Sequence, residues 1–336
     1  MPAAASPPRP VSLPRRRWLQ AALAVPAVLA GGCAVPTAPQ TAGLLGERSS
    51  GRNRRVELES VPFHPQLDHH CGPAALATAL GAMGTAVEPE RLAEQVFLPA
   101  RSGSLQVEML AGARRHGAVA VRLEPTLAAL RDELEHGRPV VVLQNLAMSF
   151  APRWHYAVLV GMDLDDATAV LRSGTTRREV MRLRTFEHTW RRAGHWAFVA
   201  LPPGQWPVRK ERERAIDAAI GFERAASPEA SERVYRSALD HWPGDLTLTM
   251  GLGNSLAAAG RWAEAAATFE GAARIHDAAP AWINLSTALL KLDDAHGALA
   301  AAQAARRVAG ERWAAAATAA HDAATAAATS SGWRRR

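Results

Sequence analysis

The composition of the chain changes near residue 207. Before about Leu201 the sequence mixes helical and strand-like patterns, whereas after Pro202-Pro203-Gly204 and the charged run 209–214 it is rich in alanine and helical in pattern. A chain of 336 residues has a length that suits two domains. Strand-rich and helical stretches that separate along a chain indicate an α+β fold or separate domains. We therefore expect an α+β domain over residues 56–206 and an all-α domain over residues 207–326, with a basic tail at 327–336.

The expected first domain places most of its helices before its strands. The spacing of apolar residues predicts the helices, and apolar runs with strand character predict the strands. The helices are expected over residues 73–82, 88–96, 105–116 and 127–136, and the strands over residues 139–146, 155–161, 168–172 and 195–201. Short connections between the strands, with turn signals such as Ser173-Gly174, favour an antiparallel sheet.

The second domain contains an internal repeat. The segment 260–266 (GRWAEAA) corresponds to the segment 292–298 (LDDAHGA), and each lies between two stretches of helical length. Pro243 and Pro280 mark the ends of units. The pattern resembles tetratricopeptide repeats, whose period is about 34 residues. This resemblance implies a concave face that binds a protein or peptide partner, and a plain helical bundle is the alternative.

The first 33 residues read as an export signal. The arginines at 15–17 precede an apolar stretch over residues 21–30, and small residues follow it up to Cys33. The stretch is too short to span a membrane as a helix. The string LAGGC that ends at Cys33 resembles a bacterial lipobox, and residues 15–20 (RRRWLQ) resemble a twin-arginine signal. The resemblance implies a lipoprotein anchored through Cys33 and facing the periplasm, with residues 34–55 as a tether. A cleaved signal peptide with an incidental cysteine is the alternative.

The net charge of +7 does not indicate a nucleic-acid partner. Much of the positive charge lies in short runs near the ends of the chain, at residues 15–17, 52–55 and 334–336. The body of the chain has no basic stripe interleaved with aromatic residues. We therefore expect no nucleic-acid binding, and no motif in the sequence calls for a cofactor.

The chain has two cysteines, Cys33 and Cys71, whose contexts are too different to favour a disulfide. His64, His69 and His70 lie close to Cys71 in the sequence. Their spacing is too tight for usual zinc ligation, and no second cysteine joins them. We expect these histidines to be solvated residues of a loop and no metal site to be present.

Cys71 has the surroundings of a nucleophile. It directly precedes a predicted helix, where unpaired N–H groups and the helix dipole stabilise a thiolate. Gly72 leaves room for a substrate beside the sulfur. Gln66, on an extended segment upstream, is placed to donate an amide N–H to a developing oxyanion together with the backbone at the helix start. An inert buried thiol is the alternative interpretation of Cys71.

Two segments resemble the bacteriocin-processing, double-glycine-leader cysteine peptidases, a papain-like family. They are residues 66–76 (QLDHHCGPAAL) and residues 155–161 (HYAVLVG), and the resemblance covers about residues 60–200. It implies a papain-like peptidase domain in which Cys71 is the nucleophile, His155 the general base and acid, and Gln66 the oxyanion donor. The chain has no P-loop motif, so the coupling of this family to an ABC exporter is not implied.

The third member of the expected catalytic site departs from the family pattern. The family has an Asp at the end of the strand after the histidine, whereas here residues 169–172 lead into Ser173. Ser173 is able to orient His155 through a hydrogen bond, but it supplies no negative charge. Asp163 is a less natural alternative because the turn carries it away from the strand start. His195 has the same local surroundings as His155, and we expect it to have a packing role.

Two functions are compatible with these features. The first is an exported cysteine peptidase that acts on a peptide or protein substrate through Cys71 and His155. The second is a peptide-binding or protein-binding lipoprotein whose peptidase-like site has lost its activity together with the Asp. The reactivity of Cys71 toward iodoacetamide, and its dependence on His155, separates the two.

Overall fold

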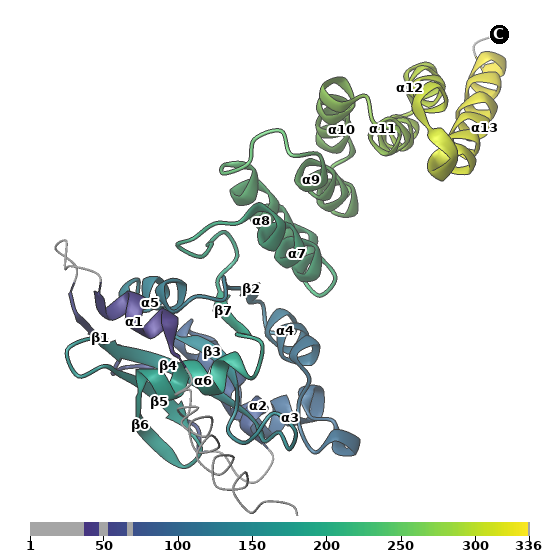
Figure 1. Ribbon diagram of the computed structural model, residues 1–336. Helices are drawn as coiled ribbons and strands as arrows, with labels where there is room; N and C mark the ends of the chain where they lie inside the picture. Colours follow the sequence, from purple (N-terminus) through teal and green to yellow (C-terminus); the bar gives the residue numbers. More distant parts are fainter. Residues whose placement is uncertain (1–36, 47–52, 66–69, 335–336) are drawn as a thin grey trace, which may run out of the picture. The chain divides into compact units, whose positions relative to one another are not determined.

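The computed structural model describes residues 37–46, 53–65 and 70–334. An α+β domain with an antiparallel sheet is followed by an all-helical region, as the change of composition predicts (Figure 1). The predicted export signal, the predicted lipidation site Cys33 and the predicted oxyanion donor Gln66 lie outside the described residues.

An antiparallel sheet is the centre of the first domain. Its strand order is β2-β7-β3-β4-β5-β6, and β1 pairs with the far end of β4. Within the described residues every strand pairing is antiparallel, as the short connections predict. The strands are β1 (Arg55–Glu57), β2 (Val119–Arg122), β3 (Val140–Asn145), β4 (Trp154–Asp163), β5 (Thr168–Ser173), β6 (Thr176–Arg182) and β7 (Ala197–Leu201).

Both faces of the sheet are apolar. Along β3, Val140 and Val142 belong to one hydrophobic core and Val141 and Leu143 to the other. Successive side chains of a strand point to opposite faces, so this alternation requires helices on both sides of the sheet. Helix α2 (Cys71–Ala82) covers the face of Val141, and helices α5 (Leu127–Glu135) and α6 (Leu183–Arg191) cover the face of Val140.

The helices of the first domain agree in part with the predicted ranges. Helices α2 to α5 begin and end within two residues of the predicted bounds, whereas α6, β1, β2 and β6 have no counterpart among the predicted elements. The helical segments are α1 (Pro39–Gly46), α2 (Cys71–Ala82), α3 (Pro89–Val96), the 3₁₀ turn η1 (Pro99–Arg101), α4 (Gln106–Arg115), α5 (Leu127–Glu135) and α6 (Leu183–Arg191).

Part of the segment 34–55, predicted as a tether, is helical in the structure. Residues 39–46 form α1, whose Leu44 is buried in the core. The backbone N–H of Thr41 donates to the Glu187 carboxylate at 2.7 Å, and Gln40 Oε1 accepts from the N–H of Leu127 at 2.7 Å. A carboxylate at a helix N-terminus satisfies N–H groups that have no partner within the helix. These contacts hold the segment against the domain despite its polar composition.

The second part of the chain is a series of stacked helices. Each helix from α8 to α12 packs against the helices before and after it, and α13 packs against both α11 and α12. Helix α13 continues through residue 327, where the basic tail was predicted to begin. The helices are α7 (Arg212–Glu223), α8 (Pro228–Leu239), α9 (Leu246–Ala258), α10 (Trp262–His276), α11 (Ala279–Lys291), α12 (Ala295–Val308) and α13 (Gly310–Arg334).

Local signals in the sequence set the starts of several of these helices. The side chains of Ser227, Asp245 and Asp294 each accept a hydrogen bond from the backbone N–H three residues later. Such N-caps satisfy a donor that the helix leaves free. Pro228 and Pro280 occupy the first turns of α8 and α11, where proline is tolerated. Among the described residues, no helix has the length and apolar character needed to cross a membrane.

Candidate active site

Cys71 is the first residue of α2. The predicted helix begins at Pro73, but the observed helix begins two residues earlier and includes the cysteine in its first turn. The N–H groups of Cys71 and Gly72 at this helix start have no partner within the helix, so they are available to an anion. Gly72 packs closely against the loop that follows η1, where an added Cβ would lie 2.4 Å from Ser104 Oγ. A larger residue at position 72 would therefore displace this loop.

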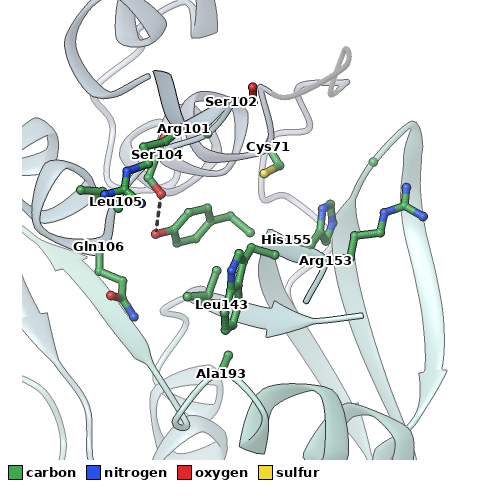
Figure 2. A pocket seen from close by; sticks show the side chains of 14 residues that line it. Cys71, Arg101, Ser102, Ser104, Leu105, Gln106, Leu143, Arg153, His155 and Ala193 are labelled. Atoms are coloured by element: carbon green, nitrogen blue, oxygen red, sulfur yellow. Dashed lines mark hydrogen bonds between the residues drawn. The ribbon is translucent and has the colours of Figure 1, made fainter. Parts of the chain in front are cut away.

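Cys71 and His155 line one cleft of about 740 Å³. Figure 2 shows both side chains at its wall, with the sulfur and the imidazole on neighbouring elements. The structure thus brings together the two residues that the sequence predicts as nucleophile and base. The other residues that line the cleft are Arg101, Ser102, Gly103, Ser104, Leu105, Gln106, Leu143, Arg153, Trp154, Tyr156, Gly174 and Ala193.

His155 is fixed by the strand that follows its own. It lies near the start of β4, and its Nε2 is 2.9 Å from the hydroxyl oxygen of Ser173 at the end of β5. Ser173 is only 6% exposed, so this hydrogen bond is shielded from water. Because Nε2 is occupied by Ser173, Nδ1 is the ring nitrogen that remains for Cys71. A serine hydroxyl therefore stands where the resemblance leads us to expect a carboxylate.

Asp163 does not orient His155. It is the last residue of β4, and eight residues of extended strand place it about 26 Å from the histidine. Its carboxylate instead accepts the backbone N–H groups of Asp165 and Asp166 and lies 3.7 Å from Arg55. Asp163 thus holds the β4–β5 turn through its carboxylate, and the alternative that Asp163 orients His155 is excluded.

Burial governs the protonation of both central groups. It raises the pKa of the Cys71 thiol, although backbone hydrogen bonds with Tyr156 and Gly72 oppose the rise. Burial also lowers the pKa of the His155 imidazole. Both shifts favour the uncharged form of the group concerned. At Cys71 burial thus opposes the stabilisation of a thiolate that the helix start predicts.

Two charged residues modulate His155 in opposite directions. After burial, the charge of Glu179 on β6 has the largest effect and raises the pKa of His155, whereas Arg153 lowers it. Glu179 lies opposite Leu171 on β5, and its half-buried position distinguishes it from its exposed neighbours Arg178 and Val180. Glu179 is therefore the carboxylate that acts on His155 from a distance, and the sequence did not single it out.

We expect Glu179→Gln to lower the pKa of His155 and Arg153→Gln to raise it. His155 must be neutral to accept the thiol proton, so the acid limb of kcat/KM against pH should move to lower pH in the first variant. In the second variant it should move to higher pH. An NMR titration of His155 measures the same shifts without a substrate. Shifts of equal sign in the two variants would contradict this electrostatic description.

The other histidines near the site have structural surroundings. The His70 ring packs edge-on against Phe97 at 5.1 Å, and its carbonyl accepts the N–H of Ala74. His195 precedes β7 with a left-handed backbone (φ 53°), and its ring packs edge-on against Trp190 at 4.7 Å. This agrees with the packing role predicted for His195. Among the described residues no group of histidine, cysteine and carboxylate side chains could hold a metal ion.

The sequence did not predict the wall of the cleft that faces Cys71. Residues 101–106 form this wall, and Tyr156 joins them through a hydrogen bond from its hydroxyl to the carbonyl of Ser104 at 3.3 Å. Burial raises the pKa of the Tyr156 hydroxyl, so the phenol stays protonated and donates. Tyr156 is adjacent to His155 in sequence, which was the available signal, but the loop has no motif that marks it.

Residues 58–198 match the model of the Peptidase_C39 like family. The chain is also similar to a protein described as a C39-like peptidase from Bacillus anthracis, with 20% identity and a TM-score of 0.37, over 44% of this chain and 98% of that one. A second similar structure is the peptidase domain of Streptococcus ComA, described as a bi-functional ABC transporter involved in a quorum-sensing pathway. Its identity is 17% and its TM-score 0.35, over 42% of this chain and 98% of that one. Comparison with curated proteins finds no match. The match contains both Cys71 and His155, and over residues 58–198 the first domain is similar to the Peptidase_C39 like family.

Proposed function

We propose that this protein is an exported, lipid-anchored cysteine peptidase that cleaves peptide bonds through Cys71 and His155. The observation that carries the proposal is the shared cleft, which joins a cysteine at a helix start to a histidine held by a buried hydroxyl. The family match over residues 58–198 supports a peptide substrate. The cleft is large enough to hold several residues of an extended peptide.

The pKa shifts of Cys71 and His155, which favour their uncharged forms, suggest the order of the steps. Cys71 Sγ attacks the scissile carbonyl carbon as its proton passes to Nδ1 of His155, and the carbonyl oxygen becomes an oxyanion. The N–H groups of Cys71 and Gly72 at the start of α2 stabilise this oxyanion, with Gln66 as the proposed side-chain donor. The imidazolium then protonates the leaving amine as the C–N bond breaks. A water molecule, deprotonated by His155, hydrolyses the thioester and restores the thiol.

Ser173 is proposed as the residue that orients His155 during these steps. Its hydroxyl accepts from Nε2–H when Nδ1 is the nitrogen that takes the thiol proton. A hydroxyl stabilises the imidazolium less than a carboxylate does, because it carries no charge. The negative charge of Glu179 offsets part of this difference. A cysteine–histidine pair tolerates the change because a thiol is the most easily activated of the side-chain nucleophiles.

The location and the partner of the protein are proposed from the sequence. The apolar stretch at 21–30 and the LAGGC string support export and lipidation at Cys33, with the mature protein facing the periplasm. The repeat of segments 260–266 and 292–298, together with the stacked helices α7 to α13, supports tetratricopeptide-like units. Such units present a face for a protein or peptide partner.

The experiment that tests this function uses the Cys33→Ala variant, in which Cys71 is the single thiol. We expect it to cleave members of a peptide library, detected by mass spectrometry, and to lose this activity when iodoacetamide has alkylated Cys71. The His155→Ala substitution should slow both the cleavage and the alkylation, because the thiol loses its base. The same Cys33→Ala chain should leave the membrane fraction in fractionated cells.

The matched control is His136→Ala, since His136 is bound to the carbonyl of Asp132 on α5 and does not line the cleft. This variant should retain both cleavage and alkylation. Alkylation that His155→Ala leaves unchanged, with no cleaved peptide, would overturn the peptidase proposal. The protein would then be a peptide-binding lipoprotein with an inactive site.

A further inference from the structure

A second cavity, of about 340 Å³, shares no lining residue with the cleft of Cys71. It lies where α4 and β2 of the first domain meet α7 of the helical region. Four of its ten lining residues are arginines and one, Asp217, is a carboxylate. The arginines are Arg114 on α4, Arg122 on β2, Arg214 on α7 and Arg224 at the end of α7.

Arg114 is the arginine of this cavity whose guanidinium is packed against α7. Its guanidinium lies against Gly221 of α7, where an added Cβ would be 2.2 Å from Cζ. Its Nε atom is buried and has no hydrogen-bond partner. Burial lowers the pKa of Arg114, the charge of Arg224 lowers it further, and Asp217 opposes both. A buried charged donor without a partner is costly, so the cavity lacks an acceptor at this position.

The neighbouring arginines leave donors free around this position. Arg214 is held by Glu211 and by the carbonyl of Leu123 at 2.8 Å. Arg122 and Arg224 form no ion pair or side-chain hydrogen bond within the part of the chain that the structure describes. Asp217 alone does not balance the surrounding charge. The cavity therefore holds guanidinium donors from three elements with too few acceptors.

We propose that this cavity binds a phosphate group. A guanidinium is planar and donates in a fork that matches phosphate and carboxylate oxygens. The guanidinium donors come from three elements, α4, β2 and α7. A phosphate group has more acceptor oxygens than a carboxylate, so it can accept hydrogen bonds from more of them. Binding would also remove the repulsion between Arg114 and Arg224. The proposal does not depend on peptidase activity, because it involves neither Cys71 nor His155.

The test is a calorimetric titration of the full chain with inorganic phosphate in a chloride buffer of constant ionic strength. We expect saturable binding that is weakened about 10- to 100-fold by either Arg122→Gln or Arg224→Gln, because each removes a charge-assisted contact. Both side chains are exposed, so the variants should fold even if Arg114→Gln does not. The matched control is Arg233→Gln, an exposed arginine on α8 whose loss should leave the affinity unchanged.

A second experiment distinguishes two sources of the phosphate group, a lipid headgroup and a free phosphorylated ligand. The full chain with Cys33→Ala, which has no site for a lipid anchor, is sedimented with vesicles of phosphatidylglycerol or of phosphatidylcholine. If the parent chain sediments with the phosphatidylglycerol vesicles and the Arg122→Gln and Arg224→Gln variants do not, the ligand is a lipid headgroup. Binding of inorganic phosphate without vesicle binding would identify a free phosphorylated ligand. Absence of saturable phosphate binding, or equal affinity in the two variants and the parent, would overturn the proposal.

Discussion

The Cys71→Ala variant is expected to have no measurable peptide cleavage and an unchanged fold. Loss of the nucleophile from an acyl-transfer site lowers kcat by up to about 10⁶-fold, and only binding and oxyanion stabilisation remain. The side chain of Cys71 is small and only partly buried at the edge of the α2 core, so alanine fits its place. The measurement is cleavage of the best library peptide at saturating concentration, with circular dichroism to confirm the fold.

The matched control for Cys71→Ala is Cys33→Ala, since it removes the other cysteine of the chain. It should retain the full rate of cleavage in solution. A Cys71→Ala protein that still cleaves at the parent rate would mean that the activity resides elsewhere. A catalytic role for Cys71 would then be abandoned, whatever the reactivity of its thiol.

The Trp190→Ala variant is expected to lose about 3–5 kcal/mol of unfolding free energy in the first domain. The Trp190 side chain is fully buried on α6, where it stacks on Phe186 at 5.9 Å. Its indole N–H donates to the carbonyl of Trp196 at 3.0 Å. Alanine would leave a large cavity, which destabilises the fold. The Trp196 carbonyl would lose one of its two donors and keep the backbone N–H of Leu143 at 3.1 Å. Denaturant unfolding followed by far-ultraviolet circular dichroism measures the loss.

The matched control is Trp154→Ala, the same substitution at an exposed tryptophan. Trp154 is 54% exposed at the rim of the cleft, so its loss should change the stability by less than about 0.5 kcal/mol. A small effect of Trp190→Ala, equal to that of Trp154→Ala, would contradict the packing described for α6. Any effect of Trp154→Ala on cleavage should appear in KM, because its side chain lines the site without reaching His155 Nε2.

The elements around the nucleophile were predictable because their sequence signals are local. The Pro73 that follows Gly72 and the apolar spacing after it predict α2, and the apolar run after His155 predicts β4. The pairing of the two residues across the cleft came from the family resemblance. The hydrogen bond between Ser173 and His155 was predictable because β4 and β5 form an antiparallel hairpin. In such a hairpin the end of β5 lies beside the start of β4.

The elements that escaped prediction have weak or conflicting local signals. Strand β6 reads TRREVMR, whose charges hide the alternation of the half-buried Glu179 and Met181. Strand β2 has four residues, too few to show a period. Helix α1 has a polar and proline-rich neighbourhood, and it is held by Glu187, far away in the sequence. Tertiary contacts decide such segments, and no window of the sequence contains them.

The electrostatics of the site could not be predicted for the same reason. The helix start suggested a stabilised thiolate, but the degree of burial of Cys71 depends on the loop 101–106 and on Tyr156. The influence of Glu179 on His155 depends on the register of β5 and β6, which places Glu179 opposite Leu171. Residue types near the nucleophile were therefore foreseeable, whereas the directions of their pKa shifts follow only from the packed structure.

The two outer strands of the sheet differ in how they avoid pairing with a second molecule. Strand β2 is packed against α7, so its open row of backbone groups lies beside a helix of the same chain. Strand β6, at the other edge, carries Arg177, Arg178 and Arg182. Charged residues on an edge strand make contact with the same edge of another copy unfavourable. Solubility at high concentration thus depends on arginines at one edge and on the presence of the helical region at the other, and a chain cut before α7 would be prone to aggregate through β2.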